Sequence, residues 1–276
     1  MKKALVVGLG EVGRPIYELL KGSGRYEVYG YDVDPSKTVN SLGAIPKSIE
    51  FLHIAFPYTN SFADSVGKYV ERFKPILVFI HSTVAPGTTR SIYNTTGVPT
   101  VFTPVRGKHP QIKKHLLFWN KWLAALPDDV VDYAAEHLKS IGLKVRIYRG
   151  EPESLELAKL WETVYRAVMI AAWQEIHRIA RKFNANLEVI AEFIAEVHQV
   201  LKDRPVYFPG YIGGHCLIPN TKILNSVYPS KLFEFVLESN QLRAKELEDP
   251  TVKNEVEKLR DLFLNLTNKE YYTDRS

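Results

Sequence analysis

The chain has 276 residues, 45% hydrophobic and 24% charged, which is typical of a soluble globular protein with one large or two ordinary domains. The single cysteine cannot form an internal disulfide, which favours the cytoplasm over secretion, and no apolar run approaches the ~20 residues of a membrane span. The net charge of +5 favours small anionic partners and is too small and dispersed to indicate nucleic-acid binding.

The first 150 residues predict alternating strands and helices. Apolar runs that predict strands occupy residues 3–7, 27–31, 50–56, 75–81, 99–103 and 143–148. Helical segments separate several of them, beginning with residues 14–21, where Pro15 suits a first helical turn. We therefore predict an α/β fold, with a Rossmann-type, mostly parallel, doubly wound sheet in a domain of residues 1–150.

After Gly150 the pattern becomes helical, which predicts an all-α domain over residues 151–276. The first helix is long and runs from Glu151 to Asn184, and a second covers residues 187–201. Residues 202–220 are rich in proline and glycine and predict a loop, and helices resume near residue 230. The apolar stripe of the long helix predicts a core face or a homodimer interface; it consists of Leu157, Trp161, Val164, Val168, Ala172, Ile176, Ile179 and Phe183.

A glycine-rich loop between the first strand and the first helix predicts a dinucleotide site. Gly8 allows a tight turn, Gly10 lets the backbone approach a pyrophosphate, and Gly13 lets the helix pack closely on the sheet. The helix N-terminus supplies N–H donors for phosphates. The predicted cofactor-binding loop comprises Gly8, Leu9, Gly10, Glu11, Val12 and Gly13.

The end of the second predicted strand indicates which dinucleotide is bound. Asp32 is placed to accept hydrogen bonds from the ribose hydroxyls, and its carboxylate repels a 2′-phosphate, so we predict NAD. Asp34 fits a turn residue in Asp34-Pro35-Ser36-Lys37. NADP remains the alternative, because Lys37 offers a cation for the extra phosphate.

Four motifs then follow in order: HSTVAPGTTR (81–90), TPVRGKHP (103–110), ELAKLWETVYRAVMIAAWQEI (156–176) and GGHCLIPN (213–220). This succession resembles the UDP-glucose/GDP-mannose dehydrogenase family, NAD-dependent enzymes that oxidise a nucleotide-sugar alcohol to a carboxylate. The resemblance covers most of residues 1–225. The chain ends where that family continues into a nucleotide-sugar-binding domain, so we expect a shortened member.

The resemblance assigns catalytic roles that are chemically sound. It makes Cys216 the nucleophile that attacks an aldehyde intermediate, and a thiolate is suited to that step. It makes Lys159 the cation that stabilises negative charge on the substrate oxygen. Ser82 and Thr83 are expected near the nicotinamide end of the cofactor, and the long helix is expected to mediate a homodimer.

Further residues are expected to contact an anionic, sugar-nucleotide-like substrate. Gly213 and Gly214 permit close approach of the backbone, and His215 either lowers the pKa of the Cys216 thiol or caps the loop. Arg106 begins a basic cluster with Lys108, His109, Lys113, Lys114 and His115, which fits either an anion site or a solvated face. No metal site is expected, because His215 and Cys216 lack a spaced second pair of ligands.

Three positions depart from the family pattern. Thr163 stands where the family usually has asparagine, Asn220 replaces an aspartate that assists hydrolysis, and Val105 replaces a carboxylate. The chain therefore has fewer residues that could assist thioester hydrolysis. Two alternatives follow: a two-electron dehydrogenase of the β-hydroxyacid type, or an NAD-binding sensor or assembly protein that has lost activity.

Overall fold

The computed structural model describes residues 1–267, so the last part of the predicted helical domain, 268–276, lies outside the described residues. The chain forms two compact units, Met1–Leu160 and Trp161–Ser276. The division falls inside one continuous helix, α6 (Pro152–Lys182), whereas the sequence pattern changes near residue 150.

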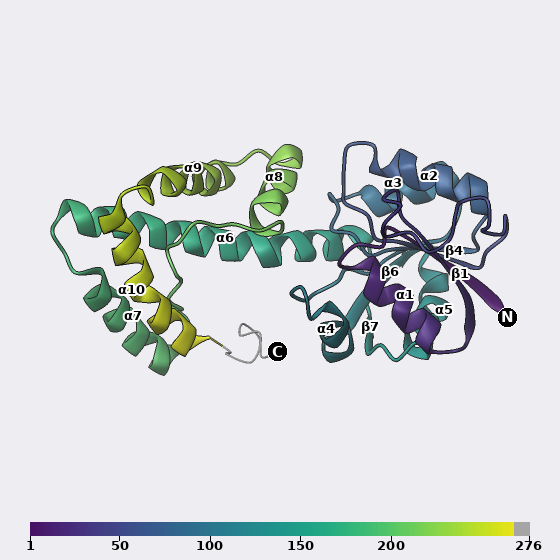
Figure 1. Cartoon of the computed structure of the whole chain (residues 1–276), viewed down its shortest axis with the longest axis horizontal. Helices are drawn as coiled ribbons and strands as arrows, with labels where there is room; N and C mark the ends of the chain where they lie inside the picture. The colour runs from purple at the N-terminus through teal and green to yellow at the C-terminus, as the bar shows by residue number, and fades with distance from the viewer. Residues whose placement is uncertain (268–276) are drawn as a thin grey trace. The chain divides into compact units, whose positions relative to one another are not determined.

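The first unit is built on a seven-stranded sheet in the order β2-β1-β3-β4-β5-β6-β7 (Figure 1). All neighbouring strands are parallel except the pair β5–β6, which is antiparallel. The chain leaves β1 to form β2 on one side and then crosses to β3 on the other, which creates a switch point where dinucleotides bind in such folds. The strands are β1 (Lys2–Val7), β2 (Tyr26–Tyr31), β3 (Phe51–Ile54), β4 (Leu77–Ile80), β5 (Thr100–Phe102), β6 (Lys121–Leu126) and β7 (Val145–Ile147).

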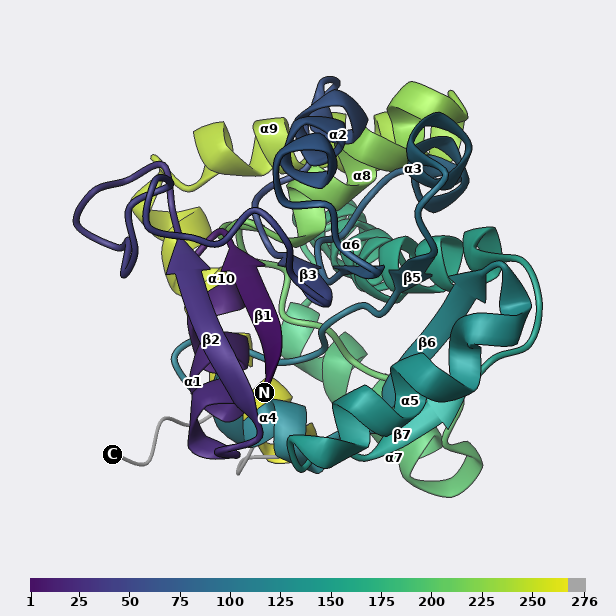
Figure 2. The ribbon, with the colours of Figure 1, turned by 90° about the vertical axis from the view of Figure 1, so that its right-hand side faces the viewer.

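Helices cover both faces of this sheet (Figure 2). Successive residues of β1 point to opposite faces, so that Ala4 and Val6 join one buried cluster while Leu5 and Val7 join the other. The first cluster packs under α1 (Gly13–Gly22), α4 (Ile112–Phe118) and α5 (Val131–Ser140). The second packs under α2 (Phe62–Phe73) and α3 (Thr88–Thr96). The predicted doubly wound α/β fold is confirmed.

Two predictions from the sequence pattern were wrong. The strand β6 was missed because KWLAAL has no β-branched residue, and it becomes a strand by pairing with β5 and β7. The predicted loop 202–220 ends early, since α8 (Leu217–Val227) already begins at Leu217. Pro219 is tolerated there because the N–H groups of a first helical turn have no partner within the helix.

Up to residue 267, the second unit consists of α6 beyond Leu160 together with α7 (Leu187–Leu201), α8, α9 (Lys231–Glu246) and α10 (Pro250–Leu266). The predicted apolar stripe of α6 is only partly buried. Val164 is inaccessible, whereas Trp161, Ile179 and Phe183 are 45%, 43% and 72% exposed. Among residues 1–267, no helix is both long enough and apolar enough to cross a bilayer.

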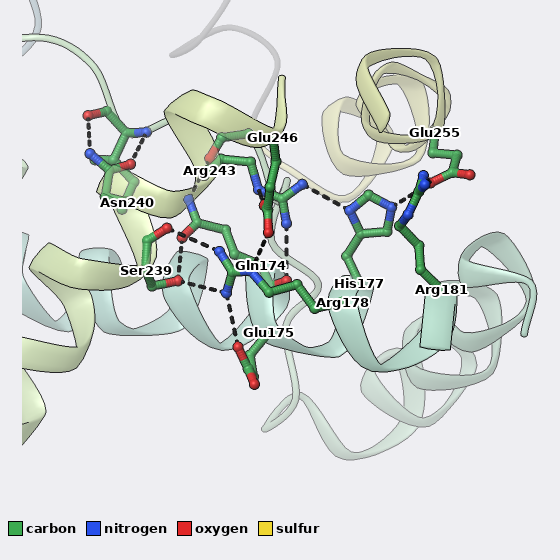
Figure 3. Close-up of polar contacts among 12 residues, drawn as sticks. Gln174, Glu175, His177, Arg178, Arg181, Ser239, Asn240, Arg243, Glu246 and Glu255 are labelled. Atoms are coloured by element: carbon green, nitrogen blue, oxygen red, sulfur yellow. Dashed lines mark hydrogen bonds and ion pairs between the residues drawn. The ribbon is translucent and has the colours of Figure 1, made fainter. Parts of the chain in front are cut away.

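A buried charged network fastens α6 to α9 and α10 (Figure 3). Arg243 of α9 has no exposed surface, and it donates to His177 Nδ1 at 2.8 Å and to the carbonyl of Gln174 at 3.0 Å. The other ring nitrogen of His177, Nε2, lies 2.8 Å from a carboxylate oxygen of Glu255 on α10. Because Arg243 can only donate, His177 must keep Nδ1 unprotonated and donate from Nε2. The ring is therefore neutral in this arrangement.

Candidate functional site

The glycine loop after β1 has the geometry of a dinucleotide cradle. Gly8 has φ +88°, and a Cβ at this position would lie 2.6 Å from the backbone nitrogen of Phe56. A Cβ on Gly13 would lie 1.7 Å from the carbonyl oxygen of Gly8, so both glycines are required by packing. A Cβ on Gly10 would meet no atom within 4 Å. The open side of the loop is therefore at Gly10, where a pyrophosphate would approach.

Asp32 follows β2 directly and is hydrogen-bonded to this loop. Its Oδ2 accepts from the backbone N–H of Leu9 at 2.6 Å, and its Oδ1 accepts from the N–H of Asp34 at 2.8 Å. The carboxylate is only partly buried. Asp32 thus lies where it could accept hydrogen bonds from an adenosine ribose, and its negative charge disfavours a 2′-phosphate on that ribose.

Asp34 has the turn role expected from the sequence. Its Oδ1 accepts from the N–H and the hydroxyl of Ser36, at 3.0 and 2.7 Å. Those hydrogen bonds, together with Lys37, lower the pKa of Asp34 to about 2. Lys37 Nζ lies 3.1 Å from Asp34, so the cation that would favour NADP already pairs with a carboxylate.

Ser82 and Thr83 lie in the loop between β4 and α3. Ser82 is buried and donates from its hydroxyl to the carbonyl of Phe56 at 2.6 Å, which ties this loop to the end of β3. Thr83 is partly exposed. The loop ends at Gly87, the residue before α3. There the N–H of Gly87 and the N–H and hydroxyl of Thr89 donate to the carboxylate of Glu156 on α6. Glu156 is the first residue of the third motif, and no site role was predicted for it.

A buried lysine that the motifs did not single out lies beside Lys159 and Arg106. Lys121 is 3% exposed and donates to the carbonyls of Thr103 and Pro104, the latter at 2.9 Å. Burial holds the pKa of Lys121 well below its usual value, and the nearby cations of Lys159 and Arg106 lower it further. Lys121 could have been found from its position at the start of a strand, had β6 been predicted.

Several side chains of the basic cluster after β5 contact other residues of this chain. Arg106 donates to the carbonyl of Asn120 at 2.8 Å and lies over the Trp119 ring, with its guanidinium carbon 4.7 Å from the ring centroid. Lys113 pairs with Glu18 on α1 at 2.8 Å. His115 is buried and accepts from the N–H of Lys108. These contacts favour a mainly structural role for much of the cluster.

The GGHC segment lies in the second unit and is accessible to solvent. Gly213, Gly214, His215 and Cys216 are all exposed, and Gly214 has φ +75°. Cys216 is the N-cap residue of α8, and its thiol is free of any disulfide. The thiol is therefore not a packed core group.

The two residues that replace the family's asparagine and aspartate contact each other directly. Asn220 Nδ2 donates to Thr163 Oγ1 at 2.9 Å, and both side chains are buried. Thr163 follows Lys159 by one turn of α6, and Asn220 follows Cys216 by one turn of α8. The pair carries no charge, and the amide nitrogen is engaged by a hydroxyl.

The sites expected from the sequence thus divide between the units. The glycine loop, Asp32, Thr83, Arg106 and Lys159 belong to the first, whereas Thr163, Gly213–Cys216 and Asn220 belong to the second. That Cys216 and Lys159 act on the same substrate stays a prediction. Within residues 1–267, no group of three or more histidine, cysteine, aspartate or glutamate side chains is arranged to hold a metal ion.

Residues 153–242 match the family model described as the UDP-glucose/GDP-mannose dehydrogenase family, central domain. Among curated proteins, the chain is 26% identical over 272 residues to a UDP-N-acetyl-D-mannosamine dehydrogenase from Pyrococcus horikoshii. That match covers 80% of this chain and 63% of the relative, so the chain spans less than two thirds of the relative's length. The resemblance indicated by the four motifs is confirmed.

Solved structures share the fold. That of UDP-D-ManNAc dehydrogenase from Pyrococcus horikoshii aligns with a TM-score of 0.72 at 21% identity, over 87% of this chain and 68% of that one. A 3-hydroxyisobutyrate dehydrogenase from Mycobacterium tuberculosis aligns with a TM-score of 0.61 at 16% identity, over 94% of this chain and 100% of that one. The same arrangement of elements therefore occurs both in a longer and in a shorter type of dehydrogenase.

Proposed function

We propose that this chain, whose residues 153–242 match the model of the UDP-glucose/GDP-mannose dehydrogenase central domain, is an NAD-dependent oxidoreductase acting on a sugar nucleotide. The observation that carries the proposal is the glycine loop that is open at Gly10 and bonded to Asp32. The similarity to UDP-N-acetyl-D-mannosamine dehydrogenase supports the substrate class.

The cofactor would be held by residues of the first unit. Gly10 and the first turn of α1 would receive the pyrophosphate, and Asp32 would accept from the ribose hydroxyls. Ser82 and Thr83 would lie toward the nicotinamide. When bound, NAD supplies the hydride acceptor for oxidation of the substrate carbon.

Two side chains would act on the substrate. The Lys159 ammonium would stabilise negative charge as it develops on the substrate oxygen when the hydroxyl proton leaves. The Cys216 thiolate would add to the carbonyl carbon of an aldehyde product and hold it as a thiohemiacetal. Gly213, Gly214, His215 and Arg106 would contact the substrate.

The Thr163–Asn220 pair supports a second candidate, in which the chain carries out a single two-electron oxidation. Hydrolysis of a thioester on Cys216 benefits from a base, and an asparagine amide is not one. The full-length likeness to a 3-hydroxyisobutyrate dehydrogenase fits the layout of such a chain. The two candidates differ in the number of NADH molecules formed per substrate, two against one.

We also propose a homodimer through α6 and a location in the cytoplasm. The exposed apolar side chains of Trp161, Ile179 and Phe183 support an interface on this helix. The absence of any cysteine besides Cys216 fits a reducing compartment.

The proposal is tested with NAD calorimetry and a panel of UDP-sugars that includes UDP-N-acetyl-D-mannosamine and UDP-glucose. We expect NAD to bind and at least one sugar nucleotide to yield NADH. Lys159→Ala should lower kcat by roughly 100-fold or more, because charge stabilisation by a positioned group is lost, whereas Lys182→Ala, an exposed lysine of the same helix, should leave it unchanged.

Cys216→Ser separates the two candidates. If the enzyme carries out both oxidations, the serine variant should release aldehyde and reduce the yield from two NADH to one. If wild type already yields one NADH and Cys216→Ser changes nothing, the two-electron candidate holds. Tight NAD binding without NADH formation across the panel would instead indicate a binding protein that has lost activity.

A further inference from the structure

The first turn of α3 lacks an acceptor from its own N-cap residue. The N-terminal N–H groups of a helix have no partner inside the helix and are usually satisfied by the side chain of the N-cap. Here the N-cap is Gly87, with φ +89°, so it has no side chain to offer. An acceptor must therefore come from elsewhere in the fold.

Glu156 of α6 supplies that acceptor. Its carboxylate accepts from the N–H of Gly87 at 2.6 Å, from the N–H of Thr89 at 2.9 Å and from the Thr89 hydroxyl at 2.6 Å. The side chain is fully buried, which raises the pKa of Glu156, while the three donors act against that rise. Such a carboxylate costs free energy to bury unless its donors remain in place.

Two further carboxylates strengthen the same junction. Arg90, in the first turn of α3, donates to Glu153 at 2.7 Å and also pairs with Glu151. The acidic residues before Lys159 therefore bind α3 and its preceding loop.

The junction connects two chain segments that the proposed function uses. Thr83 precedes Gly87 by four residues in the loop that Ser82 fastens to Phe56. Lys159 follows Glu156 by one turn of α6. We propose that Glu156 is a positioning residue, which fixes the loop carrying Thr83 relative to the turn carrying Lys159. This inference rests on the proposed function, because only there do Thr83 and Lys159 work together.

Positioning of this kind acts on the rate of the chemical step more than on cofactor binding. A misplacement of about 1 Å between reacting groups can lower a rate by about 100-fold. The NAD contacts expected at Gly10 and Asp32 do not involve Glu156, so they should persist when Glu156 is replaced. The signature is therefore a fall in kcat with little change in the affinity for NAD.

The test compares Glu156→Gln, Glu156→Ala and Glu156→Asp in the full chain, with Glu71→Gln as a matched control on the exposed face of α2. With the active UDP-sugar and NAD, we expect kcat to fall at least tenfold for the glutamine and alanine variants. The affinity for NAD, measured by calorimetry, should change less than threefold. The aspartate variant should recover part of the lost rate, and Glu71→Gln should behave as wild type.

Hydrogen exchange gives a readout that does not need activity. The amides of Gly87 and Thr89 should exchange at least tenfold faster in Glu156→Ala than in wild type, both with and without NAD. Unchanged exchange at these amides would overturn the inference even if the chain proves active. If exchange rises but kcat is unaffected in all three variants, Glu156 is structural only. Failure of wild type to form NADH would instead count against the proposed function.

Discussion

The two ends of α6 are fixed by buried charges in opposite ways. At its N-terminal end, the helix contributes the carboxylate of Glu156, and all three donors come from α3 and its preceding loop. Further along, the helix contributes His177, which stands between a guanidinium on α9 and a carboxylate on α10 (Figure 3). The first arrangement joins a helix to a loop of the predicted site, whereas the second joins three helices.

The difference shows why one cluster is a candidate for function and the other for stability. Arg243 is buried among groups that all belong to the second unit's framework, and neither it nor His177 belongs to a predicted site motif. Glu156 lies one turn from Lys159 and bonds residues of the STVAPGTT motif. Although Glu156 and Arg243 are buried to a similar extent, we expect removal of Glu156 to lower the catalytic rate and removal of Arg243 to lower the stability of the fold.

The largest loss of stability is expected from Arg243→Met. Removing the guanidinium leaves His177 Nδ1 and the Gln174 carbonyl without this donor and removes the ion pair with Glu246, and breaking such a buried network costs about 3–5 kcal/mol. Urea unfolding followed by circular dichroism measures the change. Arg260→Met, which removes an exposed pair with Glu257, is the control and should cost less than about 1 kcal/mol. Equal effects of the two substitutions would contradict the network's importance.

A smaller loss of stability is expected when the pH is lowered. Burial lowers the pKa of His177, with the neighbouring Arg243 lowering it further, although Glu255 opposes the shift. A histidine whose folded pKa lies below its unfolded value contributes stability that is present above about pH 6.5 and is lost as the pH falls.

Between pH 7 and pH 5, wild type should therefore lose more stability than His177→Gln, because only wild type has this buried imidazole to protonate as the pH falls. Urea unfolding at several pH values measures the two slopes. The buried histidines of the first unit, His53, His81 and His137, also have lowered pKa values and contribute equally to both proteins. Parallel slopes for the two proteins would refute the assignment to His177.

The smallest effect is expected at the edge of the Glu156 junction. Arg90 is 41% exposed, and pairs of this kind typically contribute less than about 1 kcal/mol. Arg90→Met should therefore change the free energy of unfolding only slightly and leave the exchange of the Thr89 amide near its wild-type rate. A loss as large as that of Glu156→Ala would show that the exposed pairs, and not the buried carboxylate, hold α3.

Much of the first unit could be predicted because its signals are local. The alternation of apolar runs with helices, the spacing of Gly8, Gly10 and Gly13, and Asp32 after a strand each depend on neighbouring residues alone. The strand β6 was missed for the opposite reason. None of its six residues is β-branched, and their conformation is decided by pairing with β5 and β7.

The candidate site divides in the same way. The sequence by itself indicated the cofactor loop and drew attention to Lys159, Thr163, Cys216 and Asn220 through their motifs. Only the tertiary structure decided that Asn220 bonds Thr163, that Lys121 is buried beside Lys159, and that Glu156 caps a helix more than sixty residues earlier in the chain. Such contacts join residues distant in sequence, so they arise only when packing brings their helices and strands together.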